Sequence, residues 1–248
     1  MLILLVLLIF FAALGIPLAF AIGASCVTYI MIYAPNFITM LPQRVWNGAY
    51  SELMIAMPLF MLAGELMNTG GITQRIINFC MELLRPIRGG LGEVNIVASM
   101  IFGGISGSSV ADTSALGSIL IPAMEKEGHY DKAYATGLAS IAGALGIIIP
   151  PSIPFVVFAS VTSASVGSLF IAGVIPGIIV ALALIFTHTI QAKHRGYVDK
   201  QPRASFKEVM KSIWDGRFAV LMPIIILGGI YGGFFTPTEA SVVAVAYG

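Results

Sequence analysis

Apolar residues fill long stretches of this chain, and shorter polar connections separate them. The longest apolar stretches are residues 1–34, 51–69, 133–175, 176–191 and 218–235. A run of about 20 mostly apolar residues is typical of a helix that crosses a bilayer. No repeated alternation of polar and apolar positions suggests the strands of a membrane barrel. The pattern predicts an all-α integral membrane protein, a polytopic helical bundle.

Residues near both ends of the sequence predict where a helix breaks and where a new helix begins. As one helix, residues 1–34 would be about 50 Å long, well beyond a hydrocarbon core of roughly 30 Å. We therefore expect a break at Gly15-Ile16-Pro17. After the last span, Thr236 or Thr238 is placed to cap a new helix. The apolar run 240–248 that follows is too short to cross, so we expect this sequence to be part of a longer protein.

Two other segments mix charged and apolar residues at helical spacing. Residues 72–88 have the amphipathic pattern of a helix that lies along the interface or links two packed bodies. The polar connection 192–217 holds seven bases against three acids, which predicts a cytoplasmic loop by the positive-inside rule. Its second half, residues 206–214, is predicted to form another interfacial helix.

Composition supports a membrane protein and excludes other classes. The chain is 58% hydrophobic and 10% charged, whereas soluble domains carry about 25% charged residues. A net charge of +1 argues against a nucleic-acid-binding surface. Cys26 and Cys80 lie in apolar contexts and are predicted to be buried thiols without a disulfide. The N-terminus lacks a basic segment and is too long for a signal peptide, so we expect a retained span.

A Gly/Ser-rich segment, residues 103–114, interrupts the apolar pattern. Its flanking apolar arms, 94–102 and 115–124, are each too short to cross a bilayer. We therefore predict a re-entrant helical hairpin with its tip inside the membrane. Ser108 or Ser109 would cap the second arm and place Asp112 in its first turn. The alternative, a patch of small residues for helix packing, leaves Asp112 unexplained.

A second break is expected at residues 143–152. Pro150 and Pro151 remove two backbone donors, which frees carbonyls near Gly146 and Ile147. A simple structural kink is the alternative. Free carbonyls and hydroxyls are ligands that a hard cation such as Na⁺ prefers, and a helix N-terminus can face an anionic substrate. A hairpin paired with an interrupted helix is the recurring arrangement of a coupled-transport site.

These segments give the chain a specific resemblance. It resembles the large membrane subunit of tripartite ATP-independent periplasmic (TRAP) transporters, the DctM-like family. The resemblance covers nearly the whole chain in family order. The matching stretches are Met57–Met67, Gly70–Thr73, Gly103–Thr113, Gly117–Met124, Ile149–Pro154 and Phe235–Ala240.

The resemblance implies an elevator-type secondary transporter with two inverted repeats, each supplying one re-entrant hairpin and one discontinuous helix. Such transporters use Na⁺ as coupling ion to import organic acids, such as C4-dicarboxylates, sialic acid or similar carboxylates. They work in the bacterial inner membrane with a small transmembrane (DctQ-like) subunit and a periplasmic substrate-binding (DctP-like) protein. This sequence would supply the first repeat and the start of the second.

The resemblance also implies how the chain is divided. Residues 1–88 would be scaffold-type helices and an interfacial arm. Residues 89–175 would be the transport-type region, with the hairpin at 89–128 and the broken helix at 133–175. A span and the basic cytoplasmic connection would follow at 176–217, then a span and the start of the second repeat at 218–248.

Carried over by position, the resemblance implies a set of site residues on both breaks. The stretch 140–146 has fewer hydroxyls than the family pattern, so we expect backbone carbonyls as ligands there. The substrate candidates are Ser108, Ser109, Pro151 and Ser152. The Na⁺ candidates are Ser106, Gly107, Ser108, Ser109, Asp112, Thr113, Gly143, Gly146, Ile149 and Pro150.

Parts of the sequence also fit other functions, namely a different transport mechanism and a serine protease. A stand-alone Na⁺/dicarboxylate symporter would move the solute without a periplasmic protein, and a channel would conduct without stoichiometric coupling. The GxSG pattern at 104–107 fits a rhomboid-like serine protease, but that chemistry needs a histidine base and His188 is the one histidine in an apolar span. We therefore predict that the chain is not an enzyme. Glu65 and Glu239 lie in or near spans and are predicted to pack or cap helices.

Overall fold

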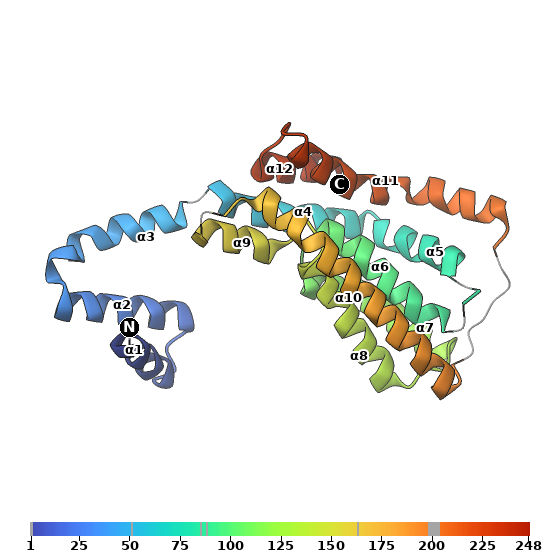
Figure 1. Ribbon diagram of the computed structural model, residues 1–248, viewed down its shortest axis with the longest axis horizontal. Helices are drawn as coiled ribbons and strands as arrows, with labels where there is room; N and C mark the ends of the chain where they lie inside the picture. Colours follow the sequence, from blue (N-terminus) through green and yellow to red (C-terminus); the bar gives the residue numbers. More distant parts are fainter. Residues whose placement is uncertain (1, 51, 85, 88, 163, 198–203) are drawn as a thin grey trace. The chain divides into compact units, whose positions relative to one another are not determined.

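The computed structural model describes residues 2–50, 52–84, 86–87, 89–162, 164–197 and 204–248, and all regular structure in these ranges is helical (Figure 1). The chain divides into two compact units, Met1–Ser51 and Glu52–Gly248. The predicted all-α class is confirmed within the described ranges. Arg85, Arg88 and residues 198–203, which the sequence predictions include, lie outside them.

The first unit contains three α-helices and a 3₁₀ turn. Helix α1 (Leu2–Ala13) packs against α2 (Leu18–Tyr33), and a 3₁₀ turn (Pro35–Met40) leads into α3 (Leu41–Ala49). The predicted break at Gly15-Ile16-Pro17 is confirmed. Gly15 has a φ of +80°, which ends α1, and Pro17 is the N-cap of α2.

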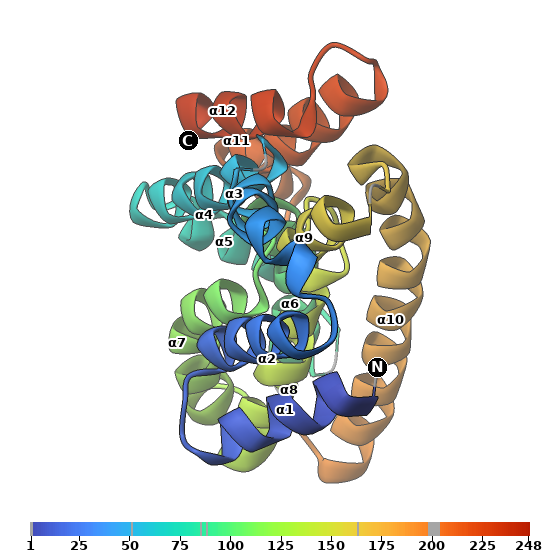
Figure 2. The ribbon, with the colours of Figure 1, turned by 90° about the vertical axis from the view of Figure 1, so that its left-hand side faces the viewer.

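The second unit carries the remaining helices and the predicted breaks. Helices α6, α7, α8 and α10 form one group, and α4, α5, α11 and α12 pack across one end of it (Figure 1). Seen from the side, α10 lies along one edge, α7 toward the other, and α6 and α8 between them (Figure 2). The helices are α4 (Glu52–Thr69), α5 (Ile72–Leu84), α6 (Gly90–Ser106), α7 (Ser109–Lys126), α8 (Lys132–Gly143), α9 (Ile153–Thr162), α10 (Val166–Arg195), α11 (Phe206–Tyr231) and α12 (Pro237–Tyr247), with a 3₁₀ turn at Ala144–Ile147.

Helix α6 is the centre of this unit. Fourteen of its seventeen residues are buried, and it contacts α4, α5, α7, α8, α10 and α11. Its large apolar side chains, such as Phe102 and Ile105, pack with Phe60 and Met67 of α4 and with Leu120 of α7 in one continuous core. Glycines on α6 let its neighbours approach the backbone closely. The first arm of the predicted hairpin is therefore surrounded by protein.

Helix α10 is long and apolar enough to cross a membrane. It begins at Val166, where Ser165 caps it by accepting a hydrogen bond from the Ser168 amide at 3.3 Å. Residues 166–175, predicted as the second half of the broken helix, therefore belong to α10, and α9 ends at Thr162. The α10 side chains Ile171, Ile175, Ile179, Leu182 and Phe186 are exposed.

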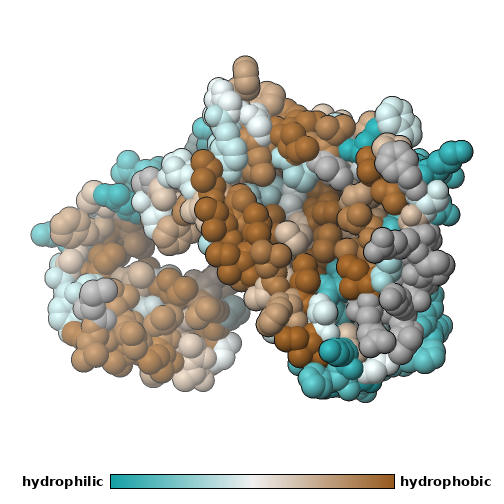
Figure 3. All heavy atoms as spheres, turned by 45° about the vertical axis from the view of Figure 1, so that its right-hand side comes forward, coloured by the Kyte–Doolittle hydropathy of each residue, from teal (hydrophilic) through white to brown (hydrophobic). Residues whose placement is uncertain are grey.

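The surface of this unit has separate apolar and hydrophilic regions. In this view apolar side chains cover much of its middle, and hydrophilic side chains gather at its lower end and at its upper right (Figure 3). By length and composition a second stretch, Pro35–Thr69, could also cross; it includes residues of both units and residue 51, which is outside the described residues. A bent pair, Lys207–Ala219 and Leu221–Tyr231, would make a third span.

The bend in that pair has a local cause. The two halves of α11 meet at 47°. Pro223 has no N–H to donate to the carbonyl of Ala219 four residues earlier, and its ring crowds that carbonyl. The charged half, which the sequence predicted as an interfacial helix, is thereby turned away from the apolar half. It packs on α5, the other predicted interfacial helix.

The base of the hairpin is held by a cluster of ring side chains around His188 of α10. His188 is buried, and its Nε2 lies 3.0 Å from the Gly89 carbonyl oxygen while its Nδ1 lies 2.9 Å from the Tyr134 hydroxyl. Tyr130 stacks on Tyr197 with 4.1 Å between the ring centroids. His188 therefore joins α10 to the start of α6, whereas its position near the membrane interface stays a prediction.

Because His188 packs directly against Gly92, we predict that no side chain larger than hydrogen fits at position 92. A Cβ there would lie 2.2 Å from His188 Nε2, so we expect Gly92→Ala to destabilise the fold by about 1–3 kcal/mol. Gly137→Ala is the matched control, since a Cβ at that helical position meets nothing within 4 Å and should be neutral or stabilising by about 0.5–1 kcal/mol. Thermal unfolding in detergent measures both. Equal melting temperatures for the two variants would contradict this packing.

Candidate functional site

The predicted hairpin is present, but its tip is tighter than expected. Within residues 90–126 only Gly107 and Ser108 lie outside helices, so the Gly/Ser segment is mostly helical instead of unwound. Gly107 has a φ of +63° and its amide donates to the Gly103 carbonyl at 3.1 Å, which closes α6. Ser108 caps α7 by accepting from the Ala111 amide at 3.4 Å, as predicted.

This geometry corrects the predicted arm lengths. The arms are 17 and 18 residues long, because the helices continue through the serines and glycines that the sequence suggested would unwind. Each is about 26 Å long at 1.5 Å per residue, close to the thickness of a hydrocarbon core. The helical hairpin is therefore a feature of the structure, whereas its depth in the membrane stays a prediction.

The second break lies where the prolines predicted it. Helix α8 ends at Gly143, a 3₁₀ turn follows, and α9 starts at Ile153 after a cis Pro150–Pro151 peptide. Pro150 has no N–H for the Gly146 carbonyl, so that oxygen loses its helical donor. The Ile147 carbonyl is not free, because the Ser152 hydroxyl donates to it at 2.7 Å.

The hairpin tip and this break are in direct contact. The Gly107 carbonyl accepts a hydrogen bond from the Ile153 amide at 3.2 Å. A Cβ on Gly103 would lie 2.7 Å from the Gly146 Cα, so the two backbones touch. Thr113 packs on Gly143 in the same way, since a Cβ on Gly143 would lie 2.0 Å from the Thr113 hydroxyl oxygen. The two breaks that the sequence paired are adjacent in space.

Asp112 lies at the centre of this contact. Its side chain has no exposed surface, and neither carboxylate oxygen has a hydrogen-bond partner among the described residues. It faces the break, because a Cβ on Gly146 would lie 3.1 Å from Asp112 Oδ2 and 3.3 Å from the Ser108 carbonyl oxygen. An unpaired buried carboxylate is costly unless a cation or a proton compensates it.

The donors around Asp112 suit one kind of cation. They are a single carboxylate, backbone carbonyls and hydroxyls, all of them oxygen atoms. In the described part of the chain, no group of three His, Cys, Asp or Glu side chains could hold a metal ion. Transition metals favour nitrogen and sulfur ligands, so the donor set fits a hard cation.

The other predicted site residues are placed unevenly. Ser106 is buried and its hydroxyl accepts from the Ser108 amide at 3.3 Å. Ile149 is half-buried and its amide donates to the Leu145 carbonyl at 2.9 Å. Pro151 and Ser152 are buried inside the break. Of the four predicted substrate residues, therefore, only Ser108 and Ser109 reach the surface.

A cavity of about 640 Å³ opens beside the tip, between α4, α6 and α7. Ser106 and Ser108 line it at the tip, and Gly64 of α4 approaches so closely that a Cβ there would lie 3.2 Å from the Ser106 Cα. Glu65 lines its wall and is exposed. No basic side chain of the described residues lines this cavity.

Several of these lining residues escaped the sequence analysis. Asn68, Ser114 and Ser118 were not singled out, and Glu65 was assigned to packing or capping. Their helical spacing could have shown them, since Glu65 and Asn68 are three apart on α4 and Ser114 and Ser118 are four apart on α7. Glu239, by contrast, caps α12 as predicted, and accepts from the Thr236 amide at 2.8 Å.

The arrangement does not favour a serine protease. Ser106 and the His188 cluster are at opposite ends of α6, about 25 Å apart along a 17-residue helix. Both His188 ring nitrogens already lie within hydrogen-bonding distance of Gly89 and Tyr134. A nucleophile needs its base within hydrogen-bond reach, so these residues form no catalytic pair.

Nearly the whole chain matches a single protein family. Residues 5–248 match the family model described as "Tripartite ATP-independent periplasmic transporter, DctM component". Similar proteins include the C4-dicarboxylate TRAP transporter large permease protein DctM of Vibrio cholerae, 42% identical over 94% of this chain and 51% of its own length. The sialic acid TRAP transporter large permease protein SiaM of Vibrio cholerae is 39% identical over 94% of this chain and 54% of its own length.

A third similar protein is longer still. The isethionate TRAP transporter permease protein DctMQ of Oleidesulfovibrio alaskensis is 37% identical over 96% of this chain and 37% of its own length. The chain thus spans about half the length, or less, of the curated relatives it matches.

The contact between tip and break predicts a contrast between two neighbouring glycines. We expect Gly103→Ala to lower the melting temperature strongly, because its Cβ would lie 2.7 Å from the Gly146 Cα, a backbone atom that cannot turn aside as a flexible side chain can. Gly104→Ala should be far milder, since the nearest atom to its Cβ is Pro223 Cγ at 3.5 Å. Thermal unfolding of the purified variants would disprove the contact if Gly104→Ala were the more damaging one.

Proposed function

Because this chain belongs to the DctM component family of tripartite ATP-independent periplasmic transporters, we propose that it is part of a large permease subunit that imports an organic acid together with Na⁺. The observation that carries the ion is Asp112, a buried carboxylate without a hydrogen-bond partner among the described residues. A bound Na⁺ would balance its charge.

The proposed Na⁺ ligands come from both breaks. Asp112 and the Ser108 carbonyl would contribute from the hairpin, and the Gly146 carbonyl, which has lost its helical donor to Pro150, would contribute from the broken helix. Thr113 and the other predicted tip residues would complete the surroundings. Because tip and break share the ion, its binding would lock them together, which is how a cation can be coupled to substrate binding.

The proposed solute is a carboxylate bound beside this tip. The names of two relatives, a C4-dicarboxylate and a sialic acid transporter, support an organic acid. The cavity next to Ser108 has room for a small acid, and the N-terminal amides of α7 carry a partial positive charge. The Glu65 carboxylate in its wall would repel an anion, so positive charge from Na⁺ or from the rest of the subunit is needed.

The proposed mechanism is elevator-type movement of the hairpin and broken helix as one body. Their contact through glycines, without intervening flexible side chains, supports such a rigid movement. The partners would be a small transmembrane subunit and a periplasmic binding protein in the bacterial inner membrane; the relative named DctMQ supports the small subunit. A stand-alone symporter would instead transport without the binding protein.

Charge removal at Asp112 tests the ion. We expect Asp112→Asn to weaken the apparent affinity for Na⁺ by about tenfold or more, because the neutral amide no longer attracts the cation. The measurement is uptake of C4-dicarboxylate or sialic acid into proteoliposomes, as a function of Na⁺, with the full-length subunit and its partners. Asp131→Asn is the control, since Asp131 is an exposed N-cap and asparagine caps equally well.

The uptake experiment has three outcomes, each with a different conclusion. Na⁺-dependent uptake that is altered in Asp112→Asn and normal in Asp131→Asn supports the proposed site. Identical Na⁺ dependence in both variants would remove Asp112 from the site. Uptake that does not respond to Na⁺ in the unmodified protein would overturn the coupling itself.

A further inference from the structure

A second groove, remote from the hairpin tip in sequence and lining, lies between the two amphipathic helices. It has a volume of about 630 Å³ and is lined by α5 and by the charged half of α11. The two helices meet closely beneath it, where a Cβ on Gly216 would lie 3.8 Å from Phe79 Cβ. Unlike the cavity at the tip, this groove carries both positive and negative side chains. Its important residues are Arg75, Lys211, Ser212, Asp215 and Arg217.

Two of the three positive side chains that line the groove are available to an anion. Within the described part of the chain, no hydrogen bond or ion pair is found for the side chains of Arg75 and Lys211. Arg217 is already engaged, because its Nη1 donates to the Trp214 carbonyl at 2.5 Å and its guanidinium carbon lies 4.3 Å from the ring centroids of both Trp214 and Phe218. These contacts fix the position of its charge beside the groove. The Ser212 hydroxyl is buried and lacks a hydrogen-bond partner among the described residues.

Negative charge is present in the same groove. Asp215 is exposed along its wall, next to the bases. Glu82 and Glu208 also line it but are already engaged, Glu208 by accepting from the Ser205 amide at 2.6 Å. The groove is therefore lined by three bases and three carboxylates, and among the carboxylates Asp215 is the exposed one with no partner in the described residues, so it can meet a cationic group.

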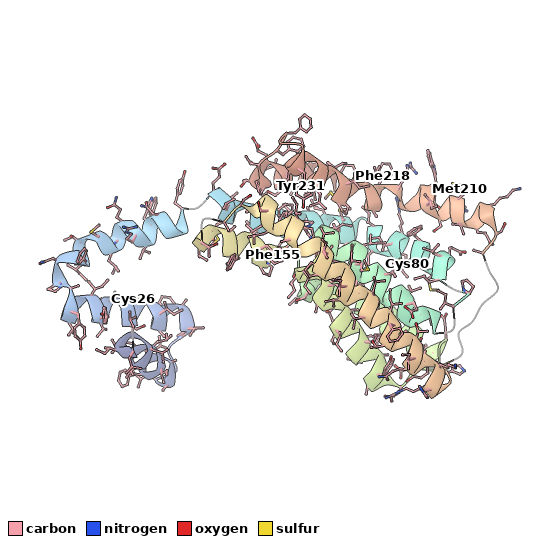
Figure 4. The ribbon with its side chains drawn as sticks, viewed as in Figure 1. Cys26, Cys80, Phe155, Met210, Phe218 and Tyr231 are labelled. Carbon is pink, nitrogen blue, oxygen red and sulfur yellow. The ribbon has the colours of Figure 1, made fainter. Side chains whose placement is uncertain are left out.

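The position of the groove along α11 points to the bilayer surface. Arg217 is the last charged residue before the apolar run 218–235, so the groove lies where α11 changes from charged to apolar. Trp214 is 66% exposed next to it, and Met210 projects from α11 on the side away from α5 (Figure 4). An exposed Trp with Arg at such a boundary is typical of headgroup depth.

We propose that this groove binds the headgroup of a zwitterionic aminophospholipid, phosphatidylethanolamine in type. The phosphate would lie against Arg75, Lys211 and Arg217 and accept from the Ser212 hydroxyl, and the primary ammonium would lie against Asp215. Mixed charge within one groove favours a zwitterion over a purely anionic headgroup. The two amphipathic helices would then be held together, and at the membrane surface, by lipid.

The test uses the purified full-length subunit, stripped of lipid in detergent, with its melting temperature measured on adding phosphatidylethanolamine, phosphatidylcholine or phosphatidylglycerol. We expect phosphatidylethanolamine to stabilise most, because phosphatidylcholine lacks N–H donors and phosphatidylglycerol lacks the ammonium. Lys211→Gln should lose at least half of this shift. Lys207→Gln, on the same helix but outside the groove, should keep all of it.

The remaining outcomes decide against the proposal or refine its charge pattern. Equal shifts with all three lipids, or an unchanged shift in Lys211→Gln, would overturn it. Asp215→Asn is an exposed substitution that should fold normally. It is expected to abolish the preference for phosphatidylethanolamine over phosphatidylglycerol, and a preserved preference would also overturn the proposal. Because none of these residues lines the cavity at the hairpin tip, the test does not depend on Na⁺ coupling.

Discussion

The constraint on which the second unit depends is the glycine contact between the hairpin tip and the broken helix. Gly103 and Gly146 bring two backbones together at a distance that leaves no room for a methyl group. Only because of this approach is Asp112 enclosed, since its carboxylate lies against the Gly146 backbone. The same contact positions the Gly107 carbonyl to receive the Ile153 amide, which anchors the start of α9. Packing and candidate chemistry therefore have one origin.

The buried Asp112 carboxylate leaves the site with a negative charge that no described residue compensates. Stability and ion binding are then linked, because whatever neutralises Asp112 also holds the tip against the break. The base of the hairpin has no such weakness, since His188, Tyr134 and Gly89 hold it with short contacts in a stacked cluster. The base of the hairpin is thus held by contacts within the protein, whereas the charge at its tip requires a cation or a proton.

The two amphipathic helices, α5 and the charged half of α11, form a second distinct region of the unit. The Pro223 bend turns the charged half of α11 onto α5, and the polar groove between them marks the level where the chain changes from charged to apolar. Of the two cysteines, Cys80 is fully buried in α5, as predicted for a small apolar side chain, whereas Cys26 in α2 is only half-buried, in contrast to the prediction (Figure 4). The groove and the hairpin tip are thus separate regions of one unit, with different charge.

The sequence by itself determined the helical membrane class, the breaks at Gly15–Pro17 and Pro150–Pro151, a serine cap at the hairpin tip and the family. These depend on local chemistry, namely apolar run length, missing proline donors and side-chain caps. It could not determine that the Gly/Ser segment stays helical, that residues 166–175 join α10, or that Glu65 and Asn68 line a cavity. Those outcomes were decided by α4, α6 and α7 packing together, because burial and close backbone approach depend on neighbours distant in sequence.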